Sequence, residues 1–135
     1  MPKGGEKRIV LNLSRSLAAV KEADEVAERV SNQMGFDPKS VDEIAISVTE
    51  AVNNAIEHGE GEILLSLIPS QDRLTIEVWD KGRGFNPKEL KEPLNPRNIM
   101  EARGRGVFIM RSLMDEVEIR FGPGTKVTLV KYRRR

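Results

Sequence analysis

The chain has 135 residues, with 22 Lys and Arg against 21 Asp and Glu, one His and no Cys. This length fits one compact domain over residues 1–135. The absence of cysteine excludes zinc ribbons, cysteine proteases and secreted disulfide scaffolds, and the formal net charge of +1 does not favour a nucleic-acid or anionic-membrane partner. Because no apolar run approaches the ~20 residues of a transmembrane helix and no signal-peptide pattern opens the chain, we expect a cytoplasmic protein.

The first elements that the pattern predicts are a strand and an amphipathic helix. Residues 8–13 place Ile9, Leu11 and Leu13 on one face, as a strand does. Residues 17–34 carry apolar side chains every three or four positions, beginning at Leu17. Ser14 or Ser16 can cap this helix, and Gly35 ends it.

A second helix carries most of the functional argument. Asp37 can cap it, Pro38 takes its first position, and its apolar positions continue as far as Gly59. Glu50 and Asn54 lie one turn apart and form a polar row that ends at the single His, His58, which we expect to have a structural or packing role. The row can be a solvated helix face, or its carboxylate and amide oxygens can hold a hard divalent cation such as Mg²⁺.

The second half of the chain predicts two hairpins separated by a long irregular segment. We expect strands at residues 63–68, 74–79, 117–121 and 126–132, and a helix at 107–114. Residues 80–105 are rich in Gly and Pro, and an irregular segment of this length inside a small domain is more often functional than accidental. The order β-α-α-β-β-loop-α-β-β predicts an α+β fold, a two-layer sandwich with a mixed, mostly antiparallel sheet and helices on one face.

Two glycine-containing segments could contact a nucleotide. Asp80 directly follows a predicted strand and precedes Gly82 and Gly84; this is either a plain turn or a carboxylate that accepts a hydrogen bond from the adenine amine. Gly104 and Gly106 open a predicted helix, which is either an ordinary glycine-rich helix start or a phosphate site. Neither a P-loop nor an H-R-D kinase motif occurs, so the chain is neither a Walker NTPase nor a eukaryotic-type protein kinase.

Four blocks of the chain, in this order, resemble the ATP-binding superfamily of gyrase, its heat-shock chaperone relatives, sensor histidine kinases and MutL. They are residues 50–58 (E-x-x-x-N-A), 80–84 (D-x-G-x-G), 104–107 (G-x-G and an aliphatic residue) and 124–127 (a G-T block). The resemblance implies the Bergerat-type ATP-binding fold, with an ATP lid at residues 85–105.

Residues 106–117 are similar to the matching stretch of the bacterial anti-sigma-factor serine kinases, which control sporulation and the general stress response. This resemblance implies a serine/threonine protein kinase that uses ATP and Mg²⁺. Such a protein sequesters a sigma factor and phosphorylates a STAS-domain anti-anti-sigma protein. It also implies a homodimer without direct contact to nucleic acid or membrane.

The resemblance also implies a role for individual residues. Glu50 would be the general base for the substrate hydroxyl, Asn54 would hold Mg²⁺ and the nucleotide, and Asp80 would bind adenine with support from Thr125. The remaining nucleotide contacts would come from Gly82, Gly84, Arg103, Gly104, Arg105, Gly106 and Val107.

Three functions remain open from the sequence. The first is the kinase that is also an anti-sigma factor, which the presence of both Glu50 and Asn54 favours because a pure binder needs no positioned base. The second is a non-catalytic ATP-binding module that regulates a protein partner. The third is nucleic-acid binding through the basic residues 131–135, against which stands the simpler reading of a solvated terminus.

Overall fold

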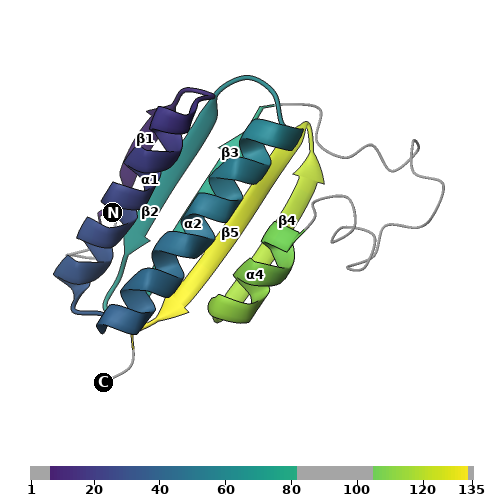
Figure 1. The fold of residues 1–135 in the computed structure, drawn as a ribbon. Coiled ribbons are helices and arrows are strands. Elements are labelled where there is room, and N and C mark those ends of the chain that lie inside the picture. The colour runs from purple at the N-terminus through teal and green to yellow at the C-terminus, as the bar shows by residue number, and fades with distance from the viewer. Residues whose placement is uncertain (1–6, 82–104, 134–135) are drawn as a thin grey trace.

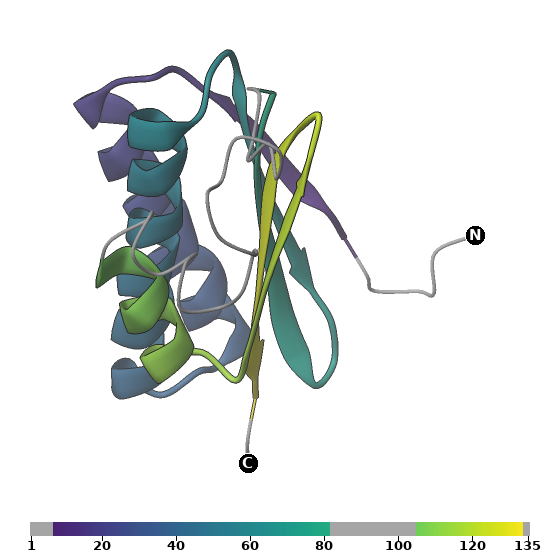
Figure 2. The same cartoon turned by 90° about the vertical axis from the view of Figure 1, so that its right-hand side faces the viewer.

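The protein, a computed structural model that describes residues 7–81 and 105–133, has two layers in this part of the chain (Figures 1 and 2). Five strands form one sheet in the order β1-β2-β3-β5-β4, and every described pair is antiparallel. Within the described residues, three helices cover one face of this sheet. The elements are β1 (Ile9–Leu13), α1 (Leu17–Met34), α2 (Pro38–His58), β2 (Ile63–Pro69), β3 (Arg73–Asp80), α4 (Arg105–Leu113), β4 (Glu116–Gly122) and β5 (Gly124–Tyr132). The predicted α+β sandwich is confirmed, and its described sheet is antiparallel throughout rather than mixed.

Local signals set the ends of α1 and α2. The Ser16 hydroxyl accepts a hydrogen bond from the Ala19 amide at 3.3 Å, and Gly35 ends α1 in the left-handed conformation with φ of 85°. Pro38 begins α2 as expected and Asp37 is its N-cap, but the predicted capping bond from the Asp37 side chain is not formed. Ser40, through its hydroxyl above all, lowers the pKa of Asp37.

The core lies between the helices and the sheet, and α2 lies over the middle of the sheet (Figure 1). Ile44, Val48 and Val52 of α2 are fully buried against the inward side chains of the strands. The helix α1 buries small side chains, alanine, serine and valine, which allows it to pack closely against α2. Leu17 is an exception to the predicted apolar stripe: it is 86% exposed, because the buried face of α1 begins at Ala19.

Cations from distant parts of the chain bind the carbonyl ends of the helices. Arg133 donates to the Met34 carbonyl at the end of α1, at 3.0 Å, and Lys131 donates to the Leu113 carbonyl at the end of α4, at 2.5 Å. These ends carry unpaired carbonyl groups and the negative pole of the helix dipole. Two residues of the basic C-terminal segment are therefore engaged inside the fold.

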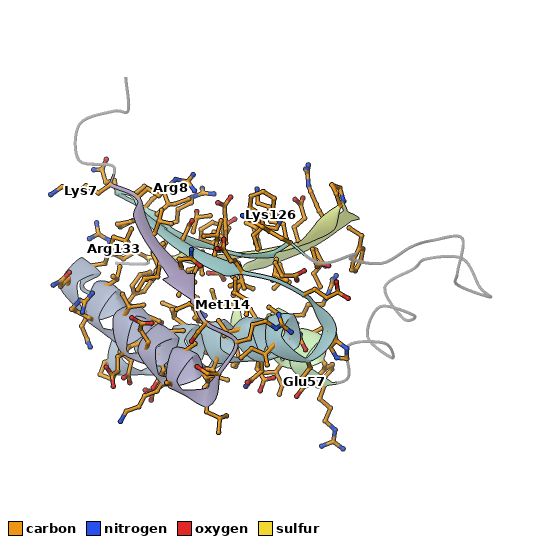
Figure 3. All side chains as sticks on the ribbon, turned by 90° about the horizontal axis from the view of Figure 1, so that it is seen from above. Lys7, Arg8, Glu57, Met114, Lys126 and Arg133 are labelled. Atoms are coloured by element: carbon orange, nitrogen blue, oxygen red, sulfur yellow. The ribbon has the colours of Figure 1, made fainter. Side chains whose placement is uncertain are left out.

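No helix of the described part of the chain covers the other face of the sheet (Figure 2). Arg8 and Lys126 lie on this face, whereas Met114 lies between the two layers (Figure 3). Burial raises the pKa of Glu77, but hydrogen bonds from Arg8 and Lys126 outweigh this effect and hold it below its usual value. The exposed Trp79 shares this face. No helix within residues 7–81 and 105–133 has the length and apolar character needed to cross a bilayer.

Candidate functional site

The last two turns of α2 hold the predicted polar row in two different environments. Asn54 is 6% exposed and belongs to the buried face of the helix, and Glu50 is half-buried. His58 is exposed, so it does not pack in the core, and its Nε2 lies 3.7 Å from the Glu57 carboxylate, which leaves the expected structural role open. The burial of Asn54 contradicts a wholly solvated helix face, because a buried amide needs partners inside the protein or in a ligand.

The first turn of α4 packs directly against this row. A methyl group added to Gly106 would lie 3.0 Å from Glu50 Oε2 and 3.1 Å from Asn54 Nδ2. Gly106 does not have a positive φ, so the space rather than the backbone conformation requires glycine here. The predicted glycine-rich helix start and the predicted polar row are therefore neighbours.

Asp80 is the last residue of β3. It pairs with Ile63 of β2 and with Thr125 of β5, and both Asp80 and Thr125 are 2% exposed. Gly124 approaches it so closely that a methyl group there would lie 2.4 Å from the Asp80 carbonyl oxygen. Because Gly124 also has φ of 144°, no other residue fits this hairpin without strain.

The helix α2 connects the two halves of the site. Gly59, directly after α2, touches the Asp80 carboxylate: a methyl group on Gly59 would lie 2.4 Å from Asp80 Cγ. Asn54 lies five residues earlier, which is about 7.5 Å along the helix axis, and Glu50 lies one turn earlier still. An elongated ligand lying along α2 would thus contact the buried Asp80 carboxylate at one end and the half-buried Glu50 carboxylate at the other. Between them it would contact the Asn54 amide and the start of α4.

The remaining predicted site residues divide into two groups. Arg105 is exposed at the start of α4, and Val107 is fully buried in the core. Gly82, Gly84, Arg103 and Gly104 lie outside the described residues, as does the predicted lid apart from its last residue.

Sequence reasoning missed two residues that contact this site. In the sequence, Gly59 indicates only the end of a helix. Its φ of −100° is open to any residue, so it is the close approach of the Asp80 side chain that requires glycine here. Arg15 gives no signal at all in a single sequence. Its guanidinium donates to the Ala55 carbonyl at 2.9 Å and the Gly59 carbonyl at 2.8 Å.

The donor set fits a cation that keeps several of its waters. Glu50 and Asn54 offer a carboxylate and an amide oxygen around the space that Gly106 leaves open. Among residues 7–81 and 105–133, no group of three or more His, Cys, Asp or Glu could hold a metal ion. Mg²⁺ is bound in this manner, by one or two protein oxygens together with water and phosphate oxygens.

Glu50 also lines a surface groove of ≈ 510 Å³ between α1 and α2. Leu17 and Val20 of α1 and Ile46 of α2 form its apolar walls. Leu17 and Ile46 are among the most exposed large apolar side chains of the described chain. A macromolecule that binds this groove would come within reach of Glu50.

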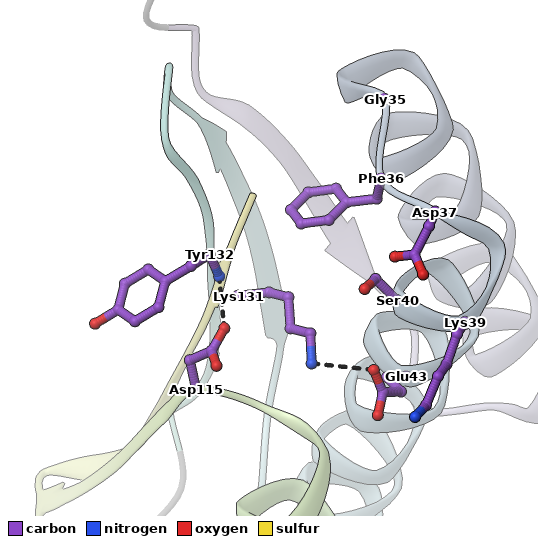
Figure 4. Close-up of a pocket in the computed structure, with 9 residues that line it drawn as sticks. All are labelled: Gly35, Phe36, Asp37, Lys39, Ser40, Glu43, Asp115, Lys131 and Tyr132. Atoms are coloured by element: carbon purple, nitrogen blue, oxygen red, sulfur yellow. Dashed lines mark hydrogen bonds and ion pairs between the residues drawn. The ribbon is translucent and has the colours of Figure 1, made fainter. Parts of the chain in front are cut away.

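A second hollow, of ≈ 430 Å³, lies where the N-terminal end of α2 meets the end of β5 (Figure 4). Lys131 lies in it and donates to Glu43 at 3.1 Å, and the Tyr132 amide donates to Asp115 at 2.7 Å. These groups bind one another and join α2 and α4 to β5. We therefore infer that the residues around this hollow stabilise the fold.

The sequence matches the family described as the histidine kinase-like ATPase domain over residues 13–131. The serine-protein kinase RsbW of Bacillus pumilus is 32% identical over 119 residues, which span 78% of this chain and 74% of that protein. RsbW of Oceanobacillus iheyensis is 30% identical over 114 residues, which span 76% of this chain and 72% of that protein. A crystal structure of the RsbU and RsbW domains of Rv1364c from Mycobacterium tuberculosis superimposes with a TM-score of 0.71 at 19% identity. That match covers 96% of this chain and 33% of the longer one, and it supports the fold alone.

Proposed function

Because the chain belongs to the histidine kinase-like ATPase domains, and among them to the RsbW serine-protein kinases, we propose that it transfers the γ-phosphate of ATP to a serine or threonine of a STAS-domain protein. The observation that carries this proposal is the close approach of Gly106 to Glu50 and Asn54. It places a helix N-terminus, which binds phosphate, beside a carboxylate that can act as a base.

The residues of the site have separate tasks in this reaction. Glu50 accepts the proton of the substrate hydroxyl while that oxygen attacks the γ-phosphorus and ADP leaves. The backbone amides at the start of α4 orient the phosphates, and Asn54 holds Mg²⁺, which neutralises phosphate charge when bound. Asp80, supported by Thr125, accepts a hydrogen bond from the amine of adenine, where guanine has an oxygen instead.

Five further candidate residues for contact with the nucleotide are glycines and arginines of the glycine-rich segments. Gly82 and Gly84 let the backbone approach the nucleotide, and Gly104 adds amides to the phosphate site. Arg103 or Arg105 adds a positive charge.

The proposal includes a sigma factor as a second protein partner, held until the STAS-domain protein displaces it, and it places the protein in the cytoplasm. The groove beside Glu50 supports a protein substrate, because its exposed Leu17 and Ile46 can be covered by a partner.

A homodimer is also proposed, and the exposed Val10 and Trp79 on the uncovered sheet face support it. Light scattering that gives the mass of a monomer at micromolar concentration would contradict the dimer.

The test of the reaction is phosphate transfer from radiolabelled ATP to a purified STAS-domain protein. Glu50→Gln should abolish transfer while ATP affinity stays within about twofold, because the carboxylate is needed only when the proton moves. The matched control is Glu57→Gln, on the same helix, with an exposed carboxylate, which should transfer at the parent rate. Transfer by Glu50→Gln at the parent rate would remove Glu50 from this role. ATP binding without transfer by the parent protein would favour a non-catalytic module.

A further inference from the structure

Arg15 lies in the loop between β1 and α1 and binds the end of α2. Its Nη1 donates to the Ala55 carbonyl at 2.9 Å, and its Nη2 donates to the carbonyls of Ile56 and of Gly59, the latter at 2.8 Å. The planar guanidinium can reach three carbonyl oxygens at once, which a lysine ammonium on a flexible stem does less well. Arg15 therefore holds the position of Gly59 relative to the last turn of α2.

Gly59 in turn forms one wall for the Asp80 side chain. A methyl group on Gly59 would lie 2.4 Å from Cγ of Asp80 and 2.7 Å from each of its carboxylate oxygens. Because Asp80 is 2% exposed, its carboxylate has little room to move away from this wall. The position of the Gly59 backbone thus sets the position of the Asp80 carboxylate.

We propose that Arg15 and Gly59 are positioning residues for the Asp80 carboxylate and that they set the preference of the site for adenine over guanine. This inference rests on the proposed contact between Asp80 and adenine. A hydrogen bond to the adenine amine requires the carboxylate oxygen at about 2.8 Å from the nitrogen. A shift of the wall by a few tenths of an ångström lengthens that bond, whereas the phosphate contacts at Asn54 and α4 stay in place.

The test is titration calorimetry of the full chain with ATP, GTP and inorganic tripolyphosphate. Arg15→Gln should lower the ATP-to-GTP affinity ratio by about tenfold, equivalent to about 1.4 kcal/mol, with tripolyphosphate affinity unchanged. Arg15→Lys should restore part of the ratio, because it returns the charge without the planar fork. Gly59→Ala should lower the ratio at least as far as Arg15→Gln does, because its new methyl group displaces the carboxylate directly.

Two matched controls separate positioning from stability. Arg133→Gln removes a cation from the carbonyl end of α1 in the same manner, away from Asp80. Gly122→Ala adds a methyl group where no atom of the described residues lies within 4 Å. Both controls should keep the parent ATP-to-GTP ratio.

The outcomes distinguish this inference from the proposed function itself. If Asp80→Asn keeps the parent ratio, the adenine contact fails, and this inference fails with it. If Asp80→Asn removes the preference while Arg15→Gln and Gly59→Ala keep it, the inference alone is wrong. Equal losses of ATP and tripolyphosphate affinity in Arg15→Gln would show a general structural effect and would also overturn it.

Discussion

The Gly106→Ala variant should lose activity without losing stability. Gly106 lies in the first turn of α4 with no positive φ, so alanine fits the backbone there. Replacing a helical glycine by alanine stabilises a helix by about 0.5–1 kcal/mol. The free energy of unfolding should therefore stay constant or rise.

Activity should fall, because the new methyl group enters the space between α4 and the polar row. It would lie 3.0 Å from Glu50 Oε2 and 3.1 Å from Asn54 Nδ2, whereas ordinary contacts begin at 3.4 Å. One side must move by about 0.4 Å, and since a displacement of about 1 Å near reacting groups lowers the rate about 100-fold, we expect a loss of roughly 5- to 10-fold.

The assay pairs initial rates of phosphate transfer at saturating Mg·ATP with urea unfolding followed by fluorescence of the single Trp. Gly122→Ala, whose methyl group meets no atom of the described residues within 4 Å, is the control and should keep the parent rate. A Gly106→Ala protein with the parent rate would refute the steric argument. A protein that loses stability and activity together would show that α4 has been displaced rather than crowded.

Three further predictions concern stability and pH. The free energy of unfolding of Ser47→Ala should exceed that of Ser31→Ala by about 1 kcal/mol in urea unfolding, because the buried Ser47 hydroxyl has no hydrogen-bond partner within residues 7–81 and 105–133, whereas the equally buried Ser31 hydroxyl donates at 2.6 Å. Equal effects of the two variants would refute this assignment. Lys131→Met should lower the free energy of unfolding by about 3 kcal/mol, because it leaves the Glu43 carboxylate without its ion pair, and adding Glu43→Gln should recover part of this loss. Additive effects of the two substitutions would show that Lys131 and Glu43 do not stabilise the fold as a pair. The pKa of Glu77 is depressed, so its contribution to stability is present above its ordinary pKa of 4.5 and is lost as pH falls through the lower pKa of the folded state. Glu77→Gln should therefore flatten the decline in unfolding free energy between about pH 5 and pH 3, and a decline as steep as that of the parent would contradict the assignment.

Local chemistry explains why the helix bounds followed from the sequence. Ser16, Gly35 and Pro38 act on the backbone within a few residues of themselves, so the signals that begin and end α1 and α2 need no knowledge of the fold. In β3 the sequence groups Leu74, Ile76 and Val78 on one face, because side chains alternate along a strand, and the structure shows that this face is the buried one.

The sequence also determined the chemical types present at the site, through the carboxylates, amide and glycines of its four blocks. Only the tertiary structure decided which of these groups meet. Gly106 approaches Glu50 and Asn54 because α2 and α4 pack side by side on the sheet, and such packing depends on the whole core.

Gly59 and Arg15 show the same limit most clearly. The signal at Gly59 was that of a helix stop, whereas its glycine is required by a carboxylate on β3. Arg15 reaches the Gly59 carbonyl across 44 positions of the chain. A long side chain near the surface can contact any backbone within its reach, and folding alone determines which backbone that is.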